Sequence, residues 1–334
     1  GKAVRLAAAA PSREASVLLA QAIQRYPQEG RYFTRLGQEY IALANVEAAK
    51  KEEERDVNTV ATYVRQAVVA GETGRRLMPN DVMAAESLAL IYENGAVYAS
   101  DALPKAEELY TRAKELEPHN PLFYLKLGQV KRATGDGKPE GAERTALYME
   151  ARDFYQKAID EKSNLAAAHY NLAIILARLK ETDRAIDSAV QAVSADQRNL
   201  NYRYNLAVLY QLRAKDGDEK KAEDIFLDIL KANEKLIDVR LSLGLLYEKQ
   251  GKKQAAIDEY QKIVNILPED ATGNIEQTRT QVEKLIDNVE SGVGNLKNPA
   301  AAQVAESAAP QPQAETVVPA PAGPNASPLT EPAP

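Results

Sequence analysis

The chain has 334 residues, carries 42 basic and 48 acidic side chains for a net charge of −6, and contains neither cysteine nor tryptophan. The missing cysteines exclude a disulfide framework, a thiolate nucleophile and a cysteine zinc site, and the even mixture of charges argues against a nucleic-acid-binding surface, which needs a clustered positive field. Apolar residues make up 45% of the chain, enough for a sizeable core, yet no run approaches the roughly 18 apolar residues of a membrane-spanning helix.

The chain begins with glycine, and its first ten residues are too short and too polar for the apolar region of a secretory signal. We therefore interpret it as a mature or processed chain. The next segment predicts a helix, because Ala15, Leu19 and Ala22 follow helical spacing up to Pro27. We interpret residues 1–29 as a leading half-repeat, the second helix of a hairpin whose first helix is missing or degenerate.

Two later segments, 166–199 and 237–270, have the same length and carry the same residue types in the same order. Each opens on a leucine followed by a small residue, Leu172-Ala173 in one and Leu243-Gly244 in the other. The same register recurs with insertions, and the predicted repeat starts lie near residues 30, 82, 121, 166, 200 and 237. A single hairpin cannot cover its apolar face, so neighbouring hairpins must stack.

Six units in register resemble the tetratricopeptide-repeat family, whose period is 34 residues. The resemblance covers residues 12–270 and implies an all-α, right-handed α-solenoid of six hairpins plus the leading half-repeat. The closing proline of the family is replaced by Ser163 and Glu234 in two repeats. No tryptophan fills the first aromatic slot, which holds Phe33, Ala85, Tyr124, His169, Arg203 and Arg240.

Two further segments follow the last repeat. Residues 271–292 predict a polar capping helix, whose apolar positions are Ile275, Val282, Leu285, Ile286 and Val289. Residues 293–334 predict an extended Pro/Ala-rich tail, since nine of the 17 prolines lie in 299–334 and no aromatic residue does. Such a composition cannot bury enough apolar surface to offset the entropy of ordering the chain.

The resemblance implies a concave groove lined by the first helix of each hairpin. Carried onto this register, its apolar positions are Met83, Leu90, Leu122, Leu125, Tyr170, Ile174, Tyr204, Val208, Leu241 and Leu245. Their polar neighbours are Thr34, Gln38, Glu86, Gln129, Arg178, Asn201, Gln211 and Glu248. The alternative is that several of these side chains simply pack against a neighbouring helix.

No motif for catalysis, a cofactor or a metal stands out. His119 and His169 are too few for an acid–base apparatus or a metal cluster, and the glycine-rich stretch 135–141 lacks the preceding strand and the spacing of a phosphate-binding loop. We therefore predict that the chain is not an enzyme and holds no cofactor.

The groove positions favour an extended peptide. The lysine, asparagine and arginine clamp of the chaperone-adaptor subfamily is replaced by Leu125, Tyr170 and Tyr204. A Pro-rich segment suits such an apolar groove because its polyproline conformation is ordered before binding, and residues 316–324 are such a segment. We predict a protein-interaction scaffold that binds residues 299–334 of a neighbouring copy, giving a head-to-tail filament or oligomer. A plain spacer tail is the alternative.

Two other interpretations remain. The degenerate early repeats resemble the extracytoplasmic repeat region of O-antigen ligase/polymerase-like membrane proteins, which would make this chain a processed part of such a protein. The lack of cysteine and the Pro/Ala-rich tail also suit a periplasmic assembly factor associated with carbohydrate or peptidoglycan. Asn325-Ala-Ser327 matches the glycosylation acceptor sequence. We therefore favour an extracytoplasmic or extracellular location over a cytoplasmic one.

Overall fold

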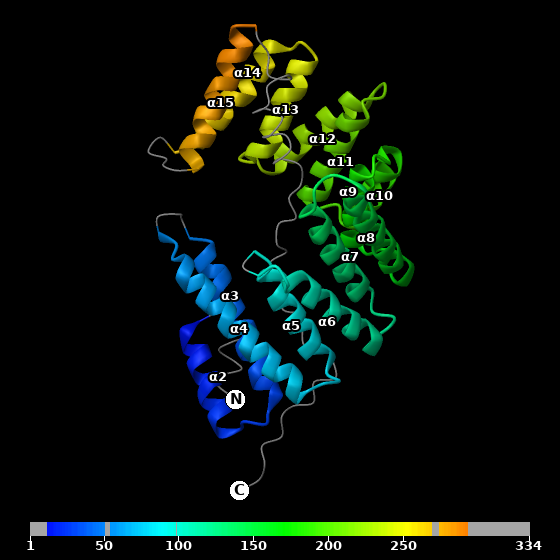
Figure 1. Cartoon of the computed structure of the whole chain (residues 1–334). Coiled ribbons are helices and arrows are strands. Elements are labelled where there is room, and N and C mark those ends of the chain that lie inside the picture. The colour runs from blue at the N-terminus through cyan, green and yellow to red at the C-terminus, as the bar shows by residue number, and fades with distance from the viewer. Residues whose placement is uncertain (1–11, 51–53, 98, 269–273, 293–334) are drawn as a thin grey trace. The chain divides into compact units, whose positions relative to one another are not determined.

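The computed structural model describes residues 12–50, 54–97, 99–268 and 274–292, and within these ranges the regular elements are α-helices with no strand (Figure 1). The expected tail and Asn325 lie outside the described residues. By its internal contacts the chain divides into two compact units, Gly1–Arg213 and Ala214–Pro334. Each unit is described by itself below.

The first unit is a succession of helical hairpins. Helix α2 precedes four pairs that contact extensively, α3 with α4, α5 with α6, α7 with α8 and α9 with α10, and each pair also contacts the next. Helix α11 packs on α10. The bounds are α2 Arg13–Arg25, α3 Gly30–Ala48, α4 Val57–Leu77, α5 Val82–Asn94, α6 Ala102–Leu116, α7 Pro121–Asp136, α8 Ala142–Glu161, α9 Ala166–Arg178, α10 Thr182–Ala195 and α11 Leu200–Arg213.

The second unit continues the helical pattern with α12 Asp218–Ala232, α13 Ile237–Lys249, α14 Lys253–Ile266 and α15 Asn274–Glu290. Helix α15 covers the apolar face of α14, where Val282, Leu285 and Val289 pack around Tyr260. Ile275, expected on the same apolar face, is instead 44% exposed. It lies at the start of the helix, before the first turn that contacts this cluster.

The predicted all-α fold of stacked hairpins is confirmed. Helices α3, α5, α7, α9, α11 and α13 begin at residues 30, 82, 121, 166, 200 and 237. The insertions are absorbed largely by longer helices, since α3, α4 and α8 have 19, 21 and 20 residues against 13 in α5, α9 and α13. No helix of the described residues combines the length and the apolar character needed to cross a membrane.

In three repeats, the residue in the slot where the family has tryptophan makes a hydrogen bond to the backbone. Tyr124 donates its hydroxyl to the carbonyl of Pro118 at 2.9 Å. The His169 ring nitrogen lies 2.8 Å from the carbonyl oxygen of Ser163, and Arg240 donates to that of Glu234 at 2.8 Å. In each case a side chain in the first turn of a hairpin is tied to the carbonyl six residues earlier. These bonds hold the turn between repeats, including the turns at Ser163 and Glu234, where the family's proline is replaced.

Within a hairpin, the closest approach is a tyrosine ring lying on a glycine. A Cβ added to Gly128 on α7 would lie 2.5 Å from Cε1 of Tyr155 on α8, and one added to Gly244 would lie 2.4 Å from Cε1 of Tyr260. Both rings are fully buried. Only a residue without a side chain lets the ring sit against the backbone of the facing helix.

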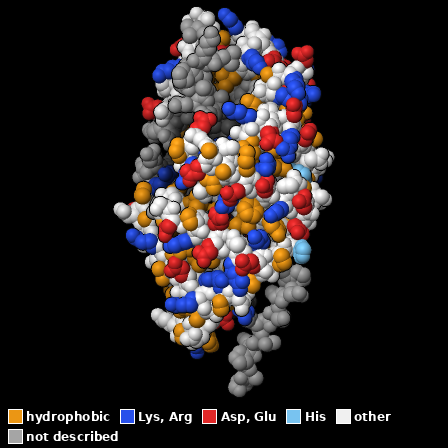
Figure 2. All heavy atoms as spheres, turned by 45° about the vertical axis from the view of Figure 1, so that its right-hand side comes forward, with side chains coloured by type: hydrophobic (Ala, Val, Ile, Leu, Met, Phe, Trp, Pro, Cys, Tyr) orange, Lys and Arg blue, Asp and Glu red, His pale blue; other side chains and the backbone are white. Residues whose placement is uncertain are grey.

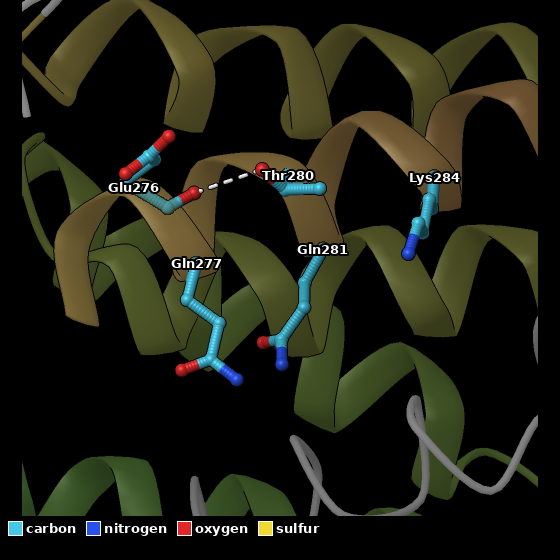
Figure 3. Close-up of a pocket in the computed structure, with 5 residues that line it drawn as sticks. All are labelled: Glu276, Gln277, Thr280, Gln281 and Lys284. Atoms are coloured by element: carbon cyan, nitrogen blue, oxygen red, sulfur yellow. Dashed lines mark hydrogen bonds between the residues drawn. The ribbon is translucent and has the colours of Figure 1, made fainter. Parts of the chain in front are cut away.

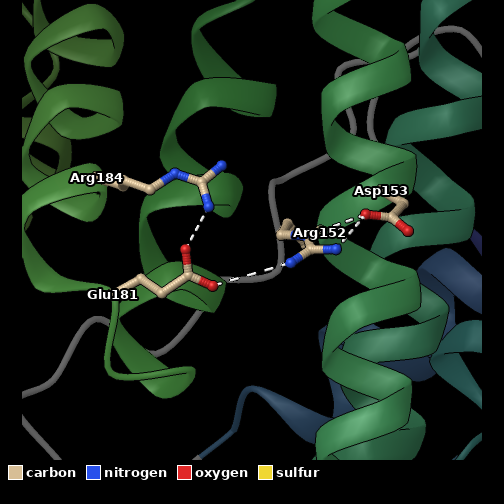
Figure 4. Close-up of polar contacts among 4 residues, drawn as sticks. All are labelled: Arg152, Asp153, Glu181 and Arg184. Atoms are coloured by element: carbon tan, nitrogen blue, oxygen red, sulfur yellow. Dashed lines mark hydrogen bonds and ion pairs between the residues drawn. The ribbon is translucent and has the colours of Figure 1, made fainter.

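Neighbouring hairpins are also joined by charges at the surface. Figure 4 shows Arg152 of α8 bonded to the adjacent Asp153 at 2.8 Å and extended toward Glu181, whose carboxylate lies 3.9 Å away. Arg184 of α10 pairs with the other oxygen of Glu181. Exposed ion pairs of this kind contribute less than about 1 kcal/mol each, so buried apolar packing remains the main source of stability.

We expect Gly128→Ala to lower the free energy of unfolding by about 1–3 kcal/mol, because the added methyl group overpacks the Tyr155 contact. Gly137→Ala on the same hairpin is the matched control, since its nearest neighbour would lie 3.5 Å away and its φ of −77° suits any residue. Its effect should stay within about 1 kcal/mol. Urea denaturation followed by circular dichroism measures both, and equal destabilisation by the two variants would contradict the contact.

Candidate peptide-binding groove

The apolar positions predicted for the groove divide into three groups. Met83 and Leu122, in the first turns of α5 and α7, are 68% and 45% exposed. Three more are half-buried, namely Leu90, Val208 and Leu245. The remaining five are buried, namely Leu125, Tyr170, Ile174, Tyr204 and Leu241.

For two of the buried positions, the structure shows which side chains they pack against. Tyr170 and Ile174 of α9 share one apolar cluster with Ala192 of α10 and Tyr202 of α11. The rings of Tyr170 and Tyr202 are 4.9 Å apart between centroids. These side chains therefore join neighbouring repeats, as the packing alternative expects, and present little surface to a ligand.

Polar side chains connect the first helices of neighbouring hairpins. Gln38 of α3 donates to the hydroxyl of Ser87 on α5 at 2.6 Å, and Lys126 of α7 lies 3.5 Å from the carboxylate of Glu93 on α5. Contacts from first helix to first helix place these residues on one side of the stack in the first unit. The groove side of α3, α5 and α7 is thus more polar than the apolar positions alone predict.

Several polar neighbours predicted for the groove are half-buried. Burial raises the pKa of Glu86 on α5, an effect that the positive charge of Lys126 opposes and the negative charge of Glu117 adds to. Gln129 of α7 has a buried amide oxygen with no hydrogen-bond partner among the described residues. Arg178 of α9, in contrast, is an exposed residue 3.2 Å from Asp136.

Sequence reasoning missed two asparagines on this side. Asn171 of α9 and Asn205 of α11 directly precede the leucine and the small residue of their repeats, and they are 4% and 3% exposed. Asn171 donates its amide to the carbonyl of Ala167 at 2.8 Å. Within the described ranges, neither amide oxygen has a hydrogen-bond partner. Their equal offset in consecutive repeats is the signal that could have identified them.

The residue four positions after the small slot faces the hydroxyl of the packed tyrosine. Tyr110 donates to Glu93 at 2.8 Å, and Tyr260 donates to Glu248 at 2.5 Å. In the α7–α8 hairpin the corresponding residue is an arginine, and the Tyr155 hydroxyl is buried with no partner in the part of the chain that the structure describes. Burial raises the pKa of Tyr155.

Charges of both signs are spread over the face that Figure 2 presents. Figure 2 shows Lys and Arg side chains interspersed with Asp and Glu across the visible face. Lys131 illustrates the pattern, since it lies 2.7 Å from Glu107 and 2.8 Å from Glu150. A surface of this kind offers pairwise complementarity and no broad field of one sign.

A pocket of about 310 Å³ lies against the outer face of α15 (Figure 3). Its polar lining consists of Glu276, Gln277, Thr280, Gln281 and Lys284. Thr280 bonds back to the carbonyl of Glu276 at 3.0 Å. None of the predicted groove residues lines this pocket, and its side chains all come from one helix.

The two histidines take part in pairwise contacts. His119 Nδ1 lies 3.2 Å from Glu161 at an exposed site, and His169 ties down a turn as described above. Among the described residues, no three His, Cys, Asp or Glu side chains gather as a metal-binding group would.

Two repeats match models of the tetratricopeptide repeat, over residues 166–199 and 238–270. A search of curated proteins found no match. These matches and the stacked hairpins identify the chain as a tetratricopeptide-repeat protein. The resemblance to O-antigen ligase/polymerase-like proteins stays a prediction.

The chain is similar to several solved structures. A crystal structure of the Cut9–Hcn1 hetero-tetramer of the APC/C aligns with a TM-score of 0.53 at 14% identity, over 80% of this chain and 45% of that one. A crystal structure of MamA aligns at 0.44 and 21% identity, over 53% and 94%. YrrB, described as a tetratricopeptide-repeat protein with an unusual peptide-binding site, aligns at 0.47 and 17% identity, over 65% and 100%. The first of these likenesses supports the fold alone.

We expect Tyr260→Phe to lower the free energy of unfolding by about 1–2 kcal/mol, because it removes a hydrogen bond to a carboxylate. Tyr155→Phe should change it by less than about 0.5 kcal/mol or raise it, since a buried hydroxyl without a partner is removed. Thermal unfolding of the two variants measures the contrast. A larger loss at Tyr155 would mean that its hydroxyl has an acceptor in the free protein.

Proposed function

We propose that the groove side of the first helices binds an extended peptide. The fold supports a scaffold for protein–protein interaction, and the finer assignment depends on Asn171 and Asn205. A buried amide oxygen without a partner loses the hydrogen bonds it would make with water and gains none in return. A backbone N–H of a bound chain would restore them.

The two asparagines suit backbone recognition for a second reason. Side-chain amides carry both an acceptor and donors, so one asparagine matches both polar groups of an extended peptide unit. Half-buried Val208 follows Asn205 by one turn of α11, offering apolar contact next to the polar group. Backbone bonds supply affinity in such a mode, and adjacent apolar contacts supply selectivity.

The favoured occupant is the Pro/Ala-rich segment 299–334 of another copy. It contains few groups that need burial and many prolines, so it loses little conformational entropy on binding. Thirty-six residues at ~3.1 Å each reach about 110 Å, enough to extend beyond its own copy. A groove on one copy and a tail on the next make a heterologous contact, which continues into a filament unless it closes into a ring.

Replacing both asparagines by alanine should weaken binding of a synthetic peptide of residues 311–334 by about tenfold or more, since two hydrogen bonds to the peptide backbone are lost. Isothermal titration calorimetry measures the affinity. Asn164→Ala, at an exposed turn residue, is the control and should bind normally. Unchanged affinity of the double variant would refute a role for these amides.

A chain ending at Asn298 should lose self-association, because it lacks the proposed occupant. Analytical ultracentrifugation and electron microscopy of the two chain lengths provide the comparison. Excess peptide 311–334 should also disperse assemblies of the whole chain by competing for the groove. If the shortened chain assembles like the whole one, the tail is not the connecting element.

A further inference from the structure

The charge of Arg132 is unusual for its position. Arg132 lies on α7, one turn after Gly128, and is only 6% exposed. The corresponding residues in the hairpins α5–α6 and α13–α14 are Glu93 and Glu248, and each accepts a tyrosine hydroxyl. The tyrosine is present in all three hairpins, so one hairpin has a cation where the other two have a carboxylate.

Arg132 has no counter-ion among the residues that the structure describes. Among the described residues its guanidinium makes no hydrogen bond or ion pair, and its Nε is buried without a partner. The cations beside it in α7 differ, because Lys126 lies 3.5 Å from Glu93 and Lys131 contacts two glutamates. Nε is the atom of the guanidinium that is buried, and a buried charged donor without a hydrogen-bond acceptor or a paired anion is unfavourable.

The nearby carboxylates are engaged elsewhere. Glu93 accepts from Tyr110 and lies near Lys126. Asp136, one turn after Arg132, accepts from Tyr148 at 2.7 Å and pairs with Arg178 at 3.2 Å. Neither of these two carboxylates therefore pairs with Arg132.

Two further orphaned groups adjoin it. The Tyr155 hydroxyl is buried without a partner, and the positive charge of Arg132 acts on it. The amide oxygen of Gln129, three residues before Arg132 on the same helix, is likewise buried without a partner. Arg132 and Tyr155 can each donate to a carboxylate, and Gln129 can accept a peptide N–H.

We propose that Arg132 and Tyr155 bind the carboxylate of an acidic side chain in the peptide held by the groove, in the place that Glu93 and Glu248 fill in the equivalent hairpins. Gln129 accepts a backbone N–H of the same segment. This proposal rests on the peptide-binding function and names the partner's chemistry, an extended segment with one glutamate or aspartate. The groove selects for an acidic residue at α7, because a neutral peptide leaves Arg132 unpaired.

The first test needs no peptide. Arg132→Glu in the whole chain recreates the tyrosine–glutamate pair of the other two hairpins, so its melting temperature should rise above that of the wild type. Arg132→Met removes the charge without adding an acceptor, and its melting temperature should not fall below that of the wild type. Arg76→Glu, at an exposed site on α4, controls for the change in net charge. A fall in melting temperature for both Arg132 variants would show that the arginine has an anion in the free protein and would overturn the proposal.

The second test compares two peptides that differ in one side chain, which is a carboxylate in one peptide and an amide in the other. The synthetic peptide of residues 311–320, which contains Glu315, should bind the whole chain about tenfold more tightly than its Glu315→Gln form. Arg132→Glu and Arg132→Met should abolish this preference, and Arg76→Glu should keep it. Equal binding of both peptides to the wild type overturns the carboxylate site while leaving the peptide-binding function intact.

A free dicarboxylate tests whether the site at Arg132 binds an anion without a peptide. Glutarate should raise the melting temperature of the wild type and of Arg76→Glu, but not that of the Arg132 variants. If neither peptide binds, the peptide-binding function fails for this segment, and stabilisation by glutarate alone would then support an anion site without a groove. No stabilisation by glutarate and no preference between the peptides would overturn the proposal.

Discussion

The structure depends on how closely the two helices of a hairpin approach each other. At Gly128 and Gly244 an atom of the facing tyrosine ring lies within 2.5 Å of where a Cβ would be, and both rings are fully buried. This contact also fixes where the tyrosine hydroxyl ends up. It points at the residue one turn further along the first helix, on the side that neighbouring first helices share. A packing requirement thereby determines a polar position on the side where neighbouring first helices contact each other.

That polar position can be filled in two ways, and the chain uses both. A glutamate there accepts the hydroxyl, as at Glu93 and Glu248, and completes a local pair. An arginine cannot accept, so the hydroxyl of Tyr155 and the guanidinium of Arg132 both remain donors. The first arrangement stabilises the hairpin by itself, whereas the second needs an acceptor from elsewhere. The same glycine–tyrosine packing thus accompanies a completed pair at Glu248 and, in our proposal, a recognition point at Arg132.

The sequence predicted the helical hairpins well because repeat periodicity reports directly which face of a helix is buried. It was less informative about the groove. Tyr170 lies at a groove position of the register, yet it packs on Tyr202 of the next repeat, because a large ring can bridge the gap between hairpins. Met83, another position predicted for the groove, stays exposed. The register gives the direction of a side chain from its own helix, but the neighbouring repeat decides whether it is covered. Asn171 and Arg132 were missed for the same reason, since an unpaired polar atom is visible only when all neighbours are placed.

Unsatisfied polar groups are costly, and a chain selected only for stability would replace them. Four residues carry buried polar atoms without partners among the described residues, namely Asn171, Asn205, Gln129 and Arg132. Leucine or methionine in their place would favour the helix and leave no polar atom unpaired. One extended acidic peptide would satisfy both sets at once, giving N–H groups to the amide oxygens and a carboxylate to the arginine. These residues lower the stability of the free protein, because the fold removes water from them without supplying partners. A peptide that supplies the partners would then bind more tightly, since little further desolvation of these groups is needed.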